Sequence, residues 1–260
     1  MEGRGTDDGG FEEMPAELMG GFGRERTGIK GMLPSSMLDW EGKLSTVLFS
    51  GGCNLRCPFC HNADLVLKPE EFEDIPWPRI EYHLVKKWEW LDGVCLTGGE
   101  PTLNPAIERI ALLIKELGFP VKLDTNGANP RAIKKLIDRS AIDHVAMDIK
   151  TTFQKYRAVS KIDGLEENIK ESIRVLVKAD KKGAIIAEFR TTFVPGIVEG
   201  EDVLEIAAHL AEVGGRRYLI QQFNPAKVLD PKASRISPKP KEYLMELAEA
   251  CAAYLPTEVR

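Results

Sequence analysis

The stretch Cys53-Asn54-Leu55-Arg56-Cys57-Pro58-Phe59-Cys60-His61 places three cysteines at C-x3-C-x2-C within eight residues, directly after an apolar run and Gly51-Gly52. Cysteine is scarce elsewhere, since only Cys95 and Cys251 remain. Three thiolates on one short loop can ligate a metal centre and leave one coordination position open, which is typical of a working cluster rather than of a closed structural site. The remaining residues should therefore indicate which ligand occupies the open coordination position.

Length and composition narrow the class of protein. A chain of 260 residues can form one large α/β domain or two small ones, and 43% apolar with 29% charged residues fits a globular protein. The net charge of −5 argues against nucleic-acid or acidic-membrane binding. No run of about 18 apolar residues predicts a membrane span, and the N-terminus lacks the pattern of a signal peptide. The clustered cysteines do not resemble a secreted disulfide framework, so we expect a cytoplasmic protein.

The N-terminal part differs from the rest in composition. Residues 1–31 hold nine of the 23 glycines together with scattered acids and show no sustained periodicity. This pattern favours a flexible Gly-rich segment over residues 1–31, followed by a single domain over residues 32–260.

Short apolar strands then alternate with amphipathic helices. We expect strands at 44–50, 93–97, 121–125, 144–150, 184–193 and 217–223, and helices near 80–91, 107–117, 130–139, 165–181, 202–213 and 241–254. Six consecutive βα units imply parallel strands with right-handed crossovers and outer helices. A closed barrel of this type needs eight units, so we predict an α/β fold built as a partial (β/α)6 TIM-like barrel, with a doubly wound sheet as the other possibility. Both architectures place the chemistry at the carboxyl ends of the strands.

Polar residues recur where these strands end. The motifs in chain order are Gly98-Gly99-Glu100-Pro101, Asp124-Thr125-Asn126-Gly127, Asp148-Ile149-Lys150, Glu188 with Arg190, and Gln221-Gln222. An apolar core would not accept such groups unpaired, so they predict a cavity. Side-chain alternation puts acids and cations on the same face, and the rim could therefore hold a zwitterionic ligand. Gly98 and Gly99 would let the backbone approach that ligand, and Glu100 would accept from its cationic group.

Two of these motifs together carry a family resemblance. C-x3-C-x2-C with Phe59 before its last cysteine, followed one βα unit later by Gly-Gly-Glu-Pro, resembles the radical S-adenosylmethionine (SAM) superfamily. The strings CNLRCPFCHN, LTGGEPTLN, LDTNG, MDIK and RTTFVPG resemble the glycyl-radical-enzyme activases, most of all the anaerobic ribonucleoside-triphosphate reductase activating protein type, with pyruvate formate-lyase activase as a cousin. The similarity covers roughly residues 33–225.

The resemblance implies a [4Fe-4S] cluster on Cys53, Cys57 and Cys60, with the amino and carboxylate groups of SAM on the fourth iron. That would fill the open coordination position. An electron from a donor such as flavodoxin or ferredoxin would cleave SAM to methionine and a 5′-deoxyadenosyl radical. In this family the radical abstracts a hydrogen atom from a backbone glycine of a partner protein, a glycyl-radical enzyme.

The resemblance also implies which residues surround SAM: Phe59, His61, Gly98, Gly99, Glu100, Asp124, Asn126, Lys150 and Arg190. Of these, the Gly-Gly-Glu motif would hold the amino group, and Phe59 and His61 would flank the cluster. In the formate-lyase cousin, residues matching Asp124, Thr125 and Asp148 bind a monovalent cation. That cousin has a histidine after the last strand, where this chain reads Gln222-Phe223-Asn224, so the substrate contacts at this position stay open.

Two other functions compete with an activase. The first keeps the radical chemistry but acts on a small molecule, as in 7-carboxy-7-deazaguanine synthase-like enzymes. The second is a zinc-binding interaction domain with His61 as the fourth ligand of a Cys3His site, although adjacent Cys60 and His61 are poor co-ligands of one tetrahedral ion. We expect Cys95 and Cys251 to be buried core thiols, and Glu188 and Arg190 could pair with each other.

Overall fold

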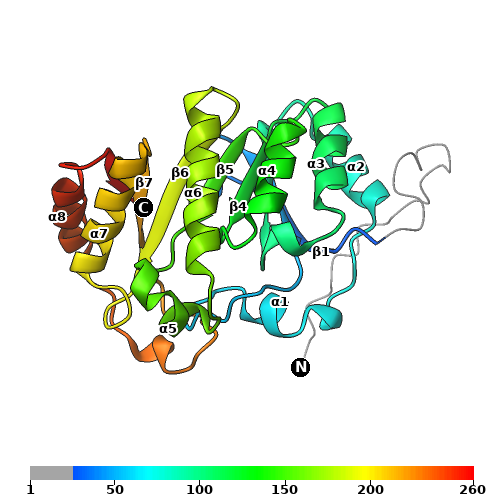
Figure 1. The fold of residues 1–260 in the computed structure, drawn as a ribbon. Helices are drawn as coiled ribbons and strands as arrows, with labels where there is room; N and C mark the ends of the chain where they lie inside the picture. Colours follow the sequence, from blue (N-terminus) through cyan, green and yellow to red (C-terminus); the bar gives the residue numbers. More distant parts are fainter. Residues whose placement is uncertain (1–25) are drawn as a thin grey trace, which may run out of the picture.

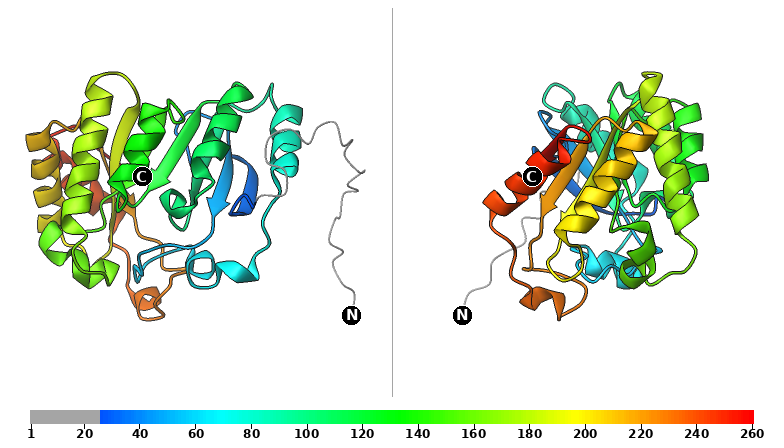
Figure 2. Two further views of the ribbon diagram at one scale, coloured as in Figure 1. Left: turned by 45° about the vertical axis from the view of Figure 1, so that its right-hand side comes forward. Right: turned by 60° about the vertical axis from the view of Figure 1, so that its left-hand side comes forward.

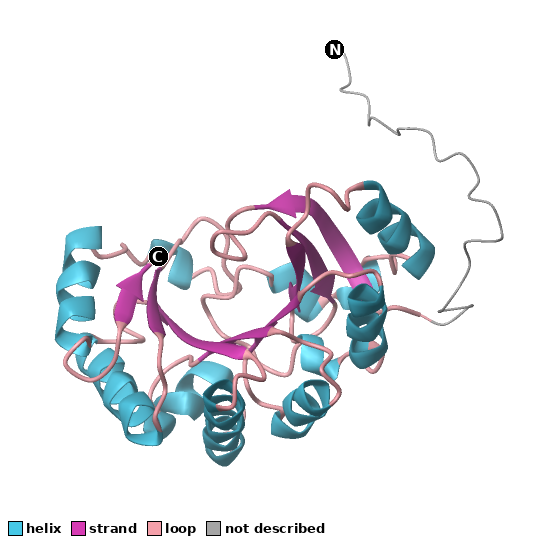
Figure 3. Cartoon of the chain, turned by 90° about the horizontal axis from the view of Figure 1, so that it is seen from above, coloured by secondary structure: helices cyan, strands magenta, loops and turns pink. Residues whose placement is uncertain are grey.

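In the computed structural model, which describes residues 26–260, eight strands form one sheet in simple sequence order. The strands are β1 (Ile29–Ser36), β2 (Ser45–Ser50), β3 (Gly93–Gly98), β4 (Val121–Thr125), β5 (His144–Asp148), β6 (Ile186–Phe193), β7 (Tyr218–Gln222) and β8 (Thr257–Val259). Neighbours from β2 to β8 pair in parallel, whereas β1 pairs antiparallel with β2. The sheet curves strongly but stays open, because β1 and β8 are its two edges (Figure 3).

Helices cover the convex face of this sheet (Figures 1 and 3). They are α2 (Trp77–Lys86), α3 (Ile107–Glu116), α4 (Pro130–Asp138), α6 (Glu166–Lys181), α7 (Gly200–Val213) and α8 (Lys241–Cys251). The short helices α1 (Ala63–Leu67) and α5 (Tyr156–Ser160) lie instead at the carboxyl ends of the strands (Figures 1 and 2). Each long helix buries an apolar stripe, as α3 does with Ile107, Ile110 and Ile114. The convex face of the parallel strands packs against these helices and the concave face encloses the barrel interior, which explains the nearly unbroken burial of β2 and β5. Within residues 26–260 no helix is long and apolar enough to cross a membrane.

The predicted architecture is confirmed in its main part. Strands β2 to β7 are the six predicted strands, joined by the predicted helices, and they form a partial barrel. The expected boundary at residue 31 falls inside a strand, because β1 already begins at Ile29, which is fully buried. Thr27, also within the segment predicted to be flexible, is buried, and residues 1–25 lie outside the described residues.

The loop between β1 and β2 fills the amino-terminal end of the partial barrel. Trp40 is buried there, edge-on to His144 with 5.6 Å between ring centroids, and the Asp39 carbonyl accepts a hydrogen bond from Lys122 Nζ. Glu41 binds Arg260 at 2.6 Å and also pairs with Arg217, so this loop is tied across the opening to the last strands. The interior therefore remains hollow only toward the carboxyl ends of the strands.

Candidate active site

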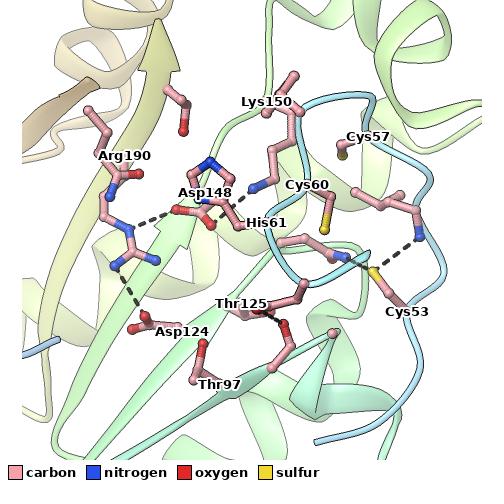
Figure 4. A pocket seen from close by; sticks show the side chains of 18 of the residues that line it. Cys53, Cys57, Cys60, His61, Thr97, Asp124, Thr125, Asp148, Lys150 and Arg190 are labelled. Carbon is pink, nitrogen blue, oxygen red and sulfur yellow. Dashed lines mark hydrogen bonds and ion pairs between the residues drawn. The ribbon is translucent and has the colours of Figure 1, made fainter. Parts of the chain in front are cut away.

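A cavity of about 380 Å³ lies at the carboxyl ends of the parallel strands. It is lined by all but one of the residues that sequence reasoning placed in the site: Cys53, Cys57, Phe59, Cys60, His61, Gly98, Gly99, Asp124, Thr125, Asn126, Asp148, Lys150 and Arg190. These residues come from the cysteine loop after β2 and from the ends of β3, β4, β5 and β6, so the parallel register of the sheet brings them together (Figure 4). Gln221 and Gln222, at the end of β7, complete the wall.

The cysteine loop has a defined shape. The Arg56 guanidinium donates to the carbonyl of Cys53 at 2.7 Å, and the Cys60 amide donates to the carbonyl of Cys57 at 3.1 Å. Cys57 is buried, and burial raises the pKa of its thiol to about 12. Burial also raises the pKa of Cys53. Without a metal both groups are therefore neutral thiols, and metal binding has to displace their protons.

Gly98 and Gly99 fix this loop to the sheet. The Gly99 amide donates to the Ser50 carbonyl at 2.9 Å, and the next amide, that of Glu100, donates to the Gly52 carbonyl at 2.8 Å. A Cβ on Gly99 would lie 1.9 Å from the Gly52 oxygen, and one on Gly98, whose φ is +121°, would lie 2.3 Å from the Ser50 oxygen. Only glycine allows this close approach of two backbones.

Glu100 is the predicted residue that does not line the cavity. Its carboxylate is 1% exposed and accepts four hydrogen bonds, two from Thr102, one from the Thr125 hydroxyl at 2.7 Å and one from the Asn126 amide at 2.7 Å. Both of its oxygens hold the ends of β3 and β4 together, and the expectation that Glu100 also accepts from a bound cationic group stays a prediction. Burial raises the pKa of Glu100, and these hydrogen bonds oppose the rise.

Charged side chains form a connected ladder across the cavity wall (Figure 4). Arg190 Nε lies 2.7 Å from Asp148 Oδ1, and its Nη1 lies 3.2 Å from Asp124 Oδ2. Lys150 Nζ lies 3.0 Å from Asp148 Oδ2, and Lys122 Nζ lies 2.8 Å from Asp124 Oδ1. Burial alone would raise the pKa of Asp148, but Arg190 and Lys150 hold it well below its usual range. In this ladder Asp124, Asp148, Lys150 and Arg190 line the cavity, and Lys122, which does not line it, is the second partner of Asp124.

Glu188 lies on the same face of β6 as Arg190 but pairs with other residues. It lies 3.6 Å from His144 Nε2 and 3.5 Å from Arg260 Nη1, deeper in the barrel. The suggestion that Glu188 pairs with Arg190 is therefore wrong, since Arg190 binds Asp148 and Asp124 instead.

Sequence reasoning missed several cavity residues. Thr192 could have been found, because it stands two positions after Arg190 on the same face of the predicted strand. Arg260 lines the cavity from the end of β8, a strand that was not predicted. Asn62 follows His61 and donates to the Gly98 carbonyl at 2.7 Å. His61 itself is exposed and contacts the carbonyl of Asn224 at 2.9 Å.

Comparison with known proteins fits this geometry. Residues 47–217 match the radical SAM superfamily. The chain belongs to this superfamily. A protein of Methanocaldococcus jannaschii named as a glycyl-radical enzyme activating enzyme is 37% identical over 87% of this chain and 92% of its own length. A second relative, named as a GTP 3′,8-cyclase of Thermococcus kodakarensis, is 28% identical over 74% of this chain and 66% of its own length.

The fold is shared with a radical SAM methyltransferase from Sphaerobacter thermophilus, with a TM-score of 0.62 at 14% identity, over 85% of this chain and 67% of the other. Membership of an enzyme superfamily overturns the alternative of a non-catalytic zinc-binding domain. Membership of the radical SAM superfamily implies that the chain binds a [4Fe-4S] cluster and SAM.

The residues present fit both groups by their chemistry. Within residues 26–260, no three histidine, cysteine, aspartate or glutamate side chains converge as they would around a single metal ion. The three thiols instead line one side of the cavity, and thiolates are the donors that iron–sulfur clusters prefer. The opposite wall offers both carboxylates and cations, as the zwitterionic end of SAM requires.

Proposed function

We propose that this radical SAM enzyme is an activase that generates a glycyl radical on a partner protein, an anaerobic ribonucleoside-triphosphate reductase. One observation carries the proposal: the relative named as a glycyl-radical enzyme activating enzyme is similar over nearly the whole of both chains. The sheet is also open between β1 and β8. Because Glu41 bridges this gap at the amino-terminal end through Arg217 and Arg260, a segment of another polypeptide would have to approach the interior from the carboxyl ends of the strands. We further propose a cytoplasmic location and a small electron-transfer protein, flavodoxin or ferredoxin, as the donor.

The side chains would share the work as follows. Cys53, Cys57 and Cys60 would hold the cluster, which when bound supplies an electron to SAM and so a 5′-deoxyadenosyl radical. Lys150 and Arg190 offer cationic groups to the carboxylate of SAM, and Asp124 and Asp148 offer acceptors to its amino group.

Two further groups would act on the surroundings of the cluster. Phe59, which is 5% exposed, would keep water from it. Gly98 and Gly99 would hold the cysteine loop against the sheet while SAM binds and its products leave.

The monovalent cation stays a prediction. Its three candidate residues have other contacts, because Arg190 bridges Asp124 and Asp148 and the Thr125 hydroxyl donates to Glu100. A cation at this position would have to displace the guanidinium from one carboxylate.

The test is an anaerobic reconstitution. The iron-loaded enzyme, a reductant and SAM are incubated with the candidate reductase, and electron paramagnetic resonance (EPR) spectra should show the doublet of a glycyl radical. The same mixture with the Cys53→Ala enzyme should show none. Formation of 5′-deoxyadenosine without a glycyl radical on any glycyl-radical enzyme would overturn the assignment of the substrate while leaving the radical chemistry in place.

A small-molecule substrate is the second candidate, and the relative named as a GTP 3′,8-cyclase supports it. This function includes the 7-carboxy-7-deazaguanine synthase-like reaction. Product analysis of the reconstituted enzyme with GTP and with deazapurine precursors would distinguish it from the activase, since only the small-molecule reaction yields a modified heterocycle.

A further inference from the structure

Asn126 contacts the cysteine loop with its side-chain amide. Its Nδ2 lies 2.8 Å from Asn54 Oδ1 and 3.7 Å from the Sγ of Cys53 (Figure 4). The residue is 6% exposed. Sequence reasoning placed Asn126 around SAM, but this amide faces a predicted cluster ligand.

The orientation of the amide follows from its other end. The backbone N–H of Ala128 donates to Asn126 Oδ1 at 2.9 Å, so this end of the amide is the oxygen and the end nearest Cys53 is the NH2 group. The backbone is fixed as well, because the Asn126 amide donates to Glu100 Oε2 at 2.7 Å. An N–H donor is therefore held near the sulfur before any ligand binds.

Metal binding strengthens this contact. In the free protein the Cys53 thiol can itself donate to Asn54 Oδ1, at 3.8 Å. Ligation removes the thiol proton and leaves a thiolate, which only accepts. Its donors are then the Leu55 amide, at 3.3 Å, and the NH2 group of Asn126.

We propose that Asn126 is a positioning residue that hydrogen-bonds the Cys53 thiolate and raises the reduction potential of the cluster. Reduction adds negative charge to the cluster and its sulfur ligands, so an N–H donor stabilises the reduced state more than the oxidised one. The inference rests on the cluster that the superfamily implies at the three cysteines. It is independent of which partner protein the enzyme activates.

The test is an EPR-monitored redox titration of the reconstituted full-length protein without SAM. Asn126→Ser keeps an oxygen that can accept from Ala128 but cannot reach the sulfur, and Asn126→Asp replaces the donor with a negative charge. At a fixed solution potential, the ratio of reduced to oxidised cluster should be about tenfold lower in Asn126→Ser than in the wild type. For a one-electron couple this corresponds to a midpoint potential about 59 mV more negative. Asn126→Asp should shift further in the same direction.

Asn129→Asp is the matched control. Asn129 caps α4 by accepting from the Ala132 amide at 3.2 Å, and an aspartate keeps that acceptor while adding the same charge three residues away. This variant should leave the potential near that of the wild type. An unchanged midpoint in Asn126→Ser, at equal iron and sulfide content, overturns the proposal.

A second measurement can overturn the proposal with the wild type alone and so does not depend on variants that assemble a cluster. The protein is labelled with asparagine that carries ¹⁵N only at the side-chain amide, and pulsed EPR is recorded on the reduced cluster. Every asparagine carries the label, and the Asn54 side chain also lies beside Cys53. A ¹⁵N hyperfine coupling that is lost in Asn126→Ser therefore supports the hydrogen bond to Cys53, and absence of any coupling in the wild type overturns it.

Discussion

Glu100 offers the sharpest test of how the site is held together. One carboxylate oxygen accepts from the Thr102 amide at 3.1 Å, from the Thr102 hydroxyl at 2.6 Å and from the Thr125 hydroxyl at 2.7 Å. The other accepts from the Asn126 amide at 2.7 Å. The side chain is 1% exposed, so these bonds are shielded from solvent.

The size of the effect follows from the donors that lose their partner. Glu100→Ala leaves the backbone amides of Thr102 and Asn126 buried and unpaired, and each such donor costs about 1–3 kcal/mol, so the free energy of unfolding should fall by about 2–6 kcal/mol. Glu100→Gln keeps the oxygen with three donors and places its NH2 group against the Asn126 amide. It should therefore lose only about 1–3 kcal/mol.

Urea unfolding of the metal-free protein under reducing conditions, followed by circular dichroism, measures both values. Glu108→Ala is the control, because Glu108 pairs with Lys135 and Arg139 at the surface and such ion pairs contribute about 0–1 kcal/mol. If Glu100→Ala costs no more than this control, Glu100 does not fasten β3 to β4 and the predicted contact with a ligand has to be reconsidered.

Three further changes have defined outcomes. Burial raises the pKa of Glu188, but His144 and nearby cations lower it from 4.5 to about 2. The ionised carboxylate therefore stabilises the fold above about pH 4.5, by at most about 3 kcal/mol, and this contribution is lost as the pH falls toward 2. In Glu188→Gln the free energy of unfolding, measured by urea titration, should depend less on pH between 4.5 and 2. An unchanged pH dependence would contradict the assignment. Cys53→Ala should lose most bound iron and sulfide whereas Cys251→Ala, buried behind the sheet, keeps both; equal loading of the two proteins would refute the ligand assignment. Gly99→Ala should lower the free energy of unfolding by about 2 kcal/mol, because its Cβ would meet a backbone oxygen at 1.9 Å, and an unchanged melting temperature would count against this packing.

The order of strands and helices was predictable because short strands with apolar runs, such as β2 and β3, alternate with amphipathic helices. The edges of the sheet were not. β1 contains Gly31 and Pro34 and alternates poorly in burial, as an exposed edge strand can, and β8 has only three residues. Both edge strands are strands because they pair with a neighbouring strand, and such pairing leaves no pattern in the local sequence.

Motifs located the cavity residues but could not show what each one contacts. Glu100 and Asn126 stand in neighbouring polar motifs, and their sequence context suits a ligand equally well. The structure distinguishes them, because Glu100 is turned between the two loops and Asn126 is turned toward Cys53. Such choices depend on distances of a few ångströms between strands far apart in the sequence, so they lie beyond sequence reasoning.

The charge ladder constrains what can enter the cavity. Asp148 is paired with Lys150 and Arg190, and Asp124 with Arg190 and Lys122, so a ligand with a single charge would have to separate an ion pair and leave one buried partner uncompensated. A zwitterion avoids this, because its carboxylate can pair with a cation of the wall while its amino group pairs with the aspartate that this cation releases. The same exchange keeps the net charge beside the cysteines constant. The ion pairs of the wall therefore favour a ligand that carries both charges close together, as the amino acid end of SAM does.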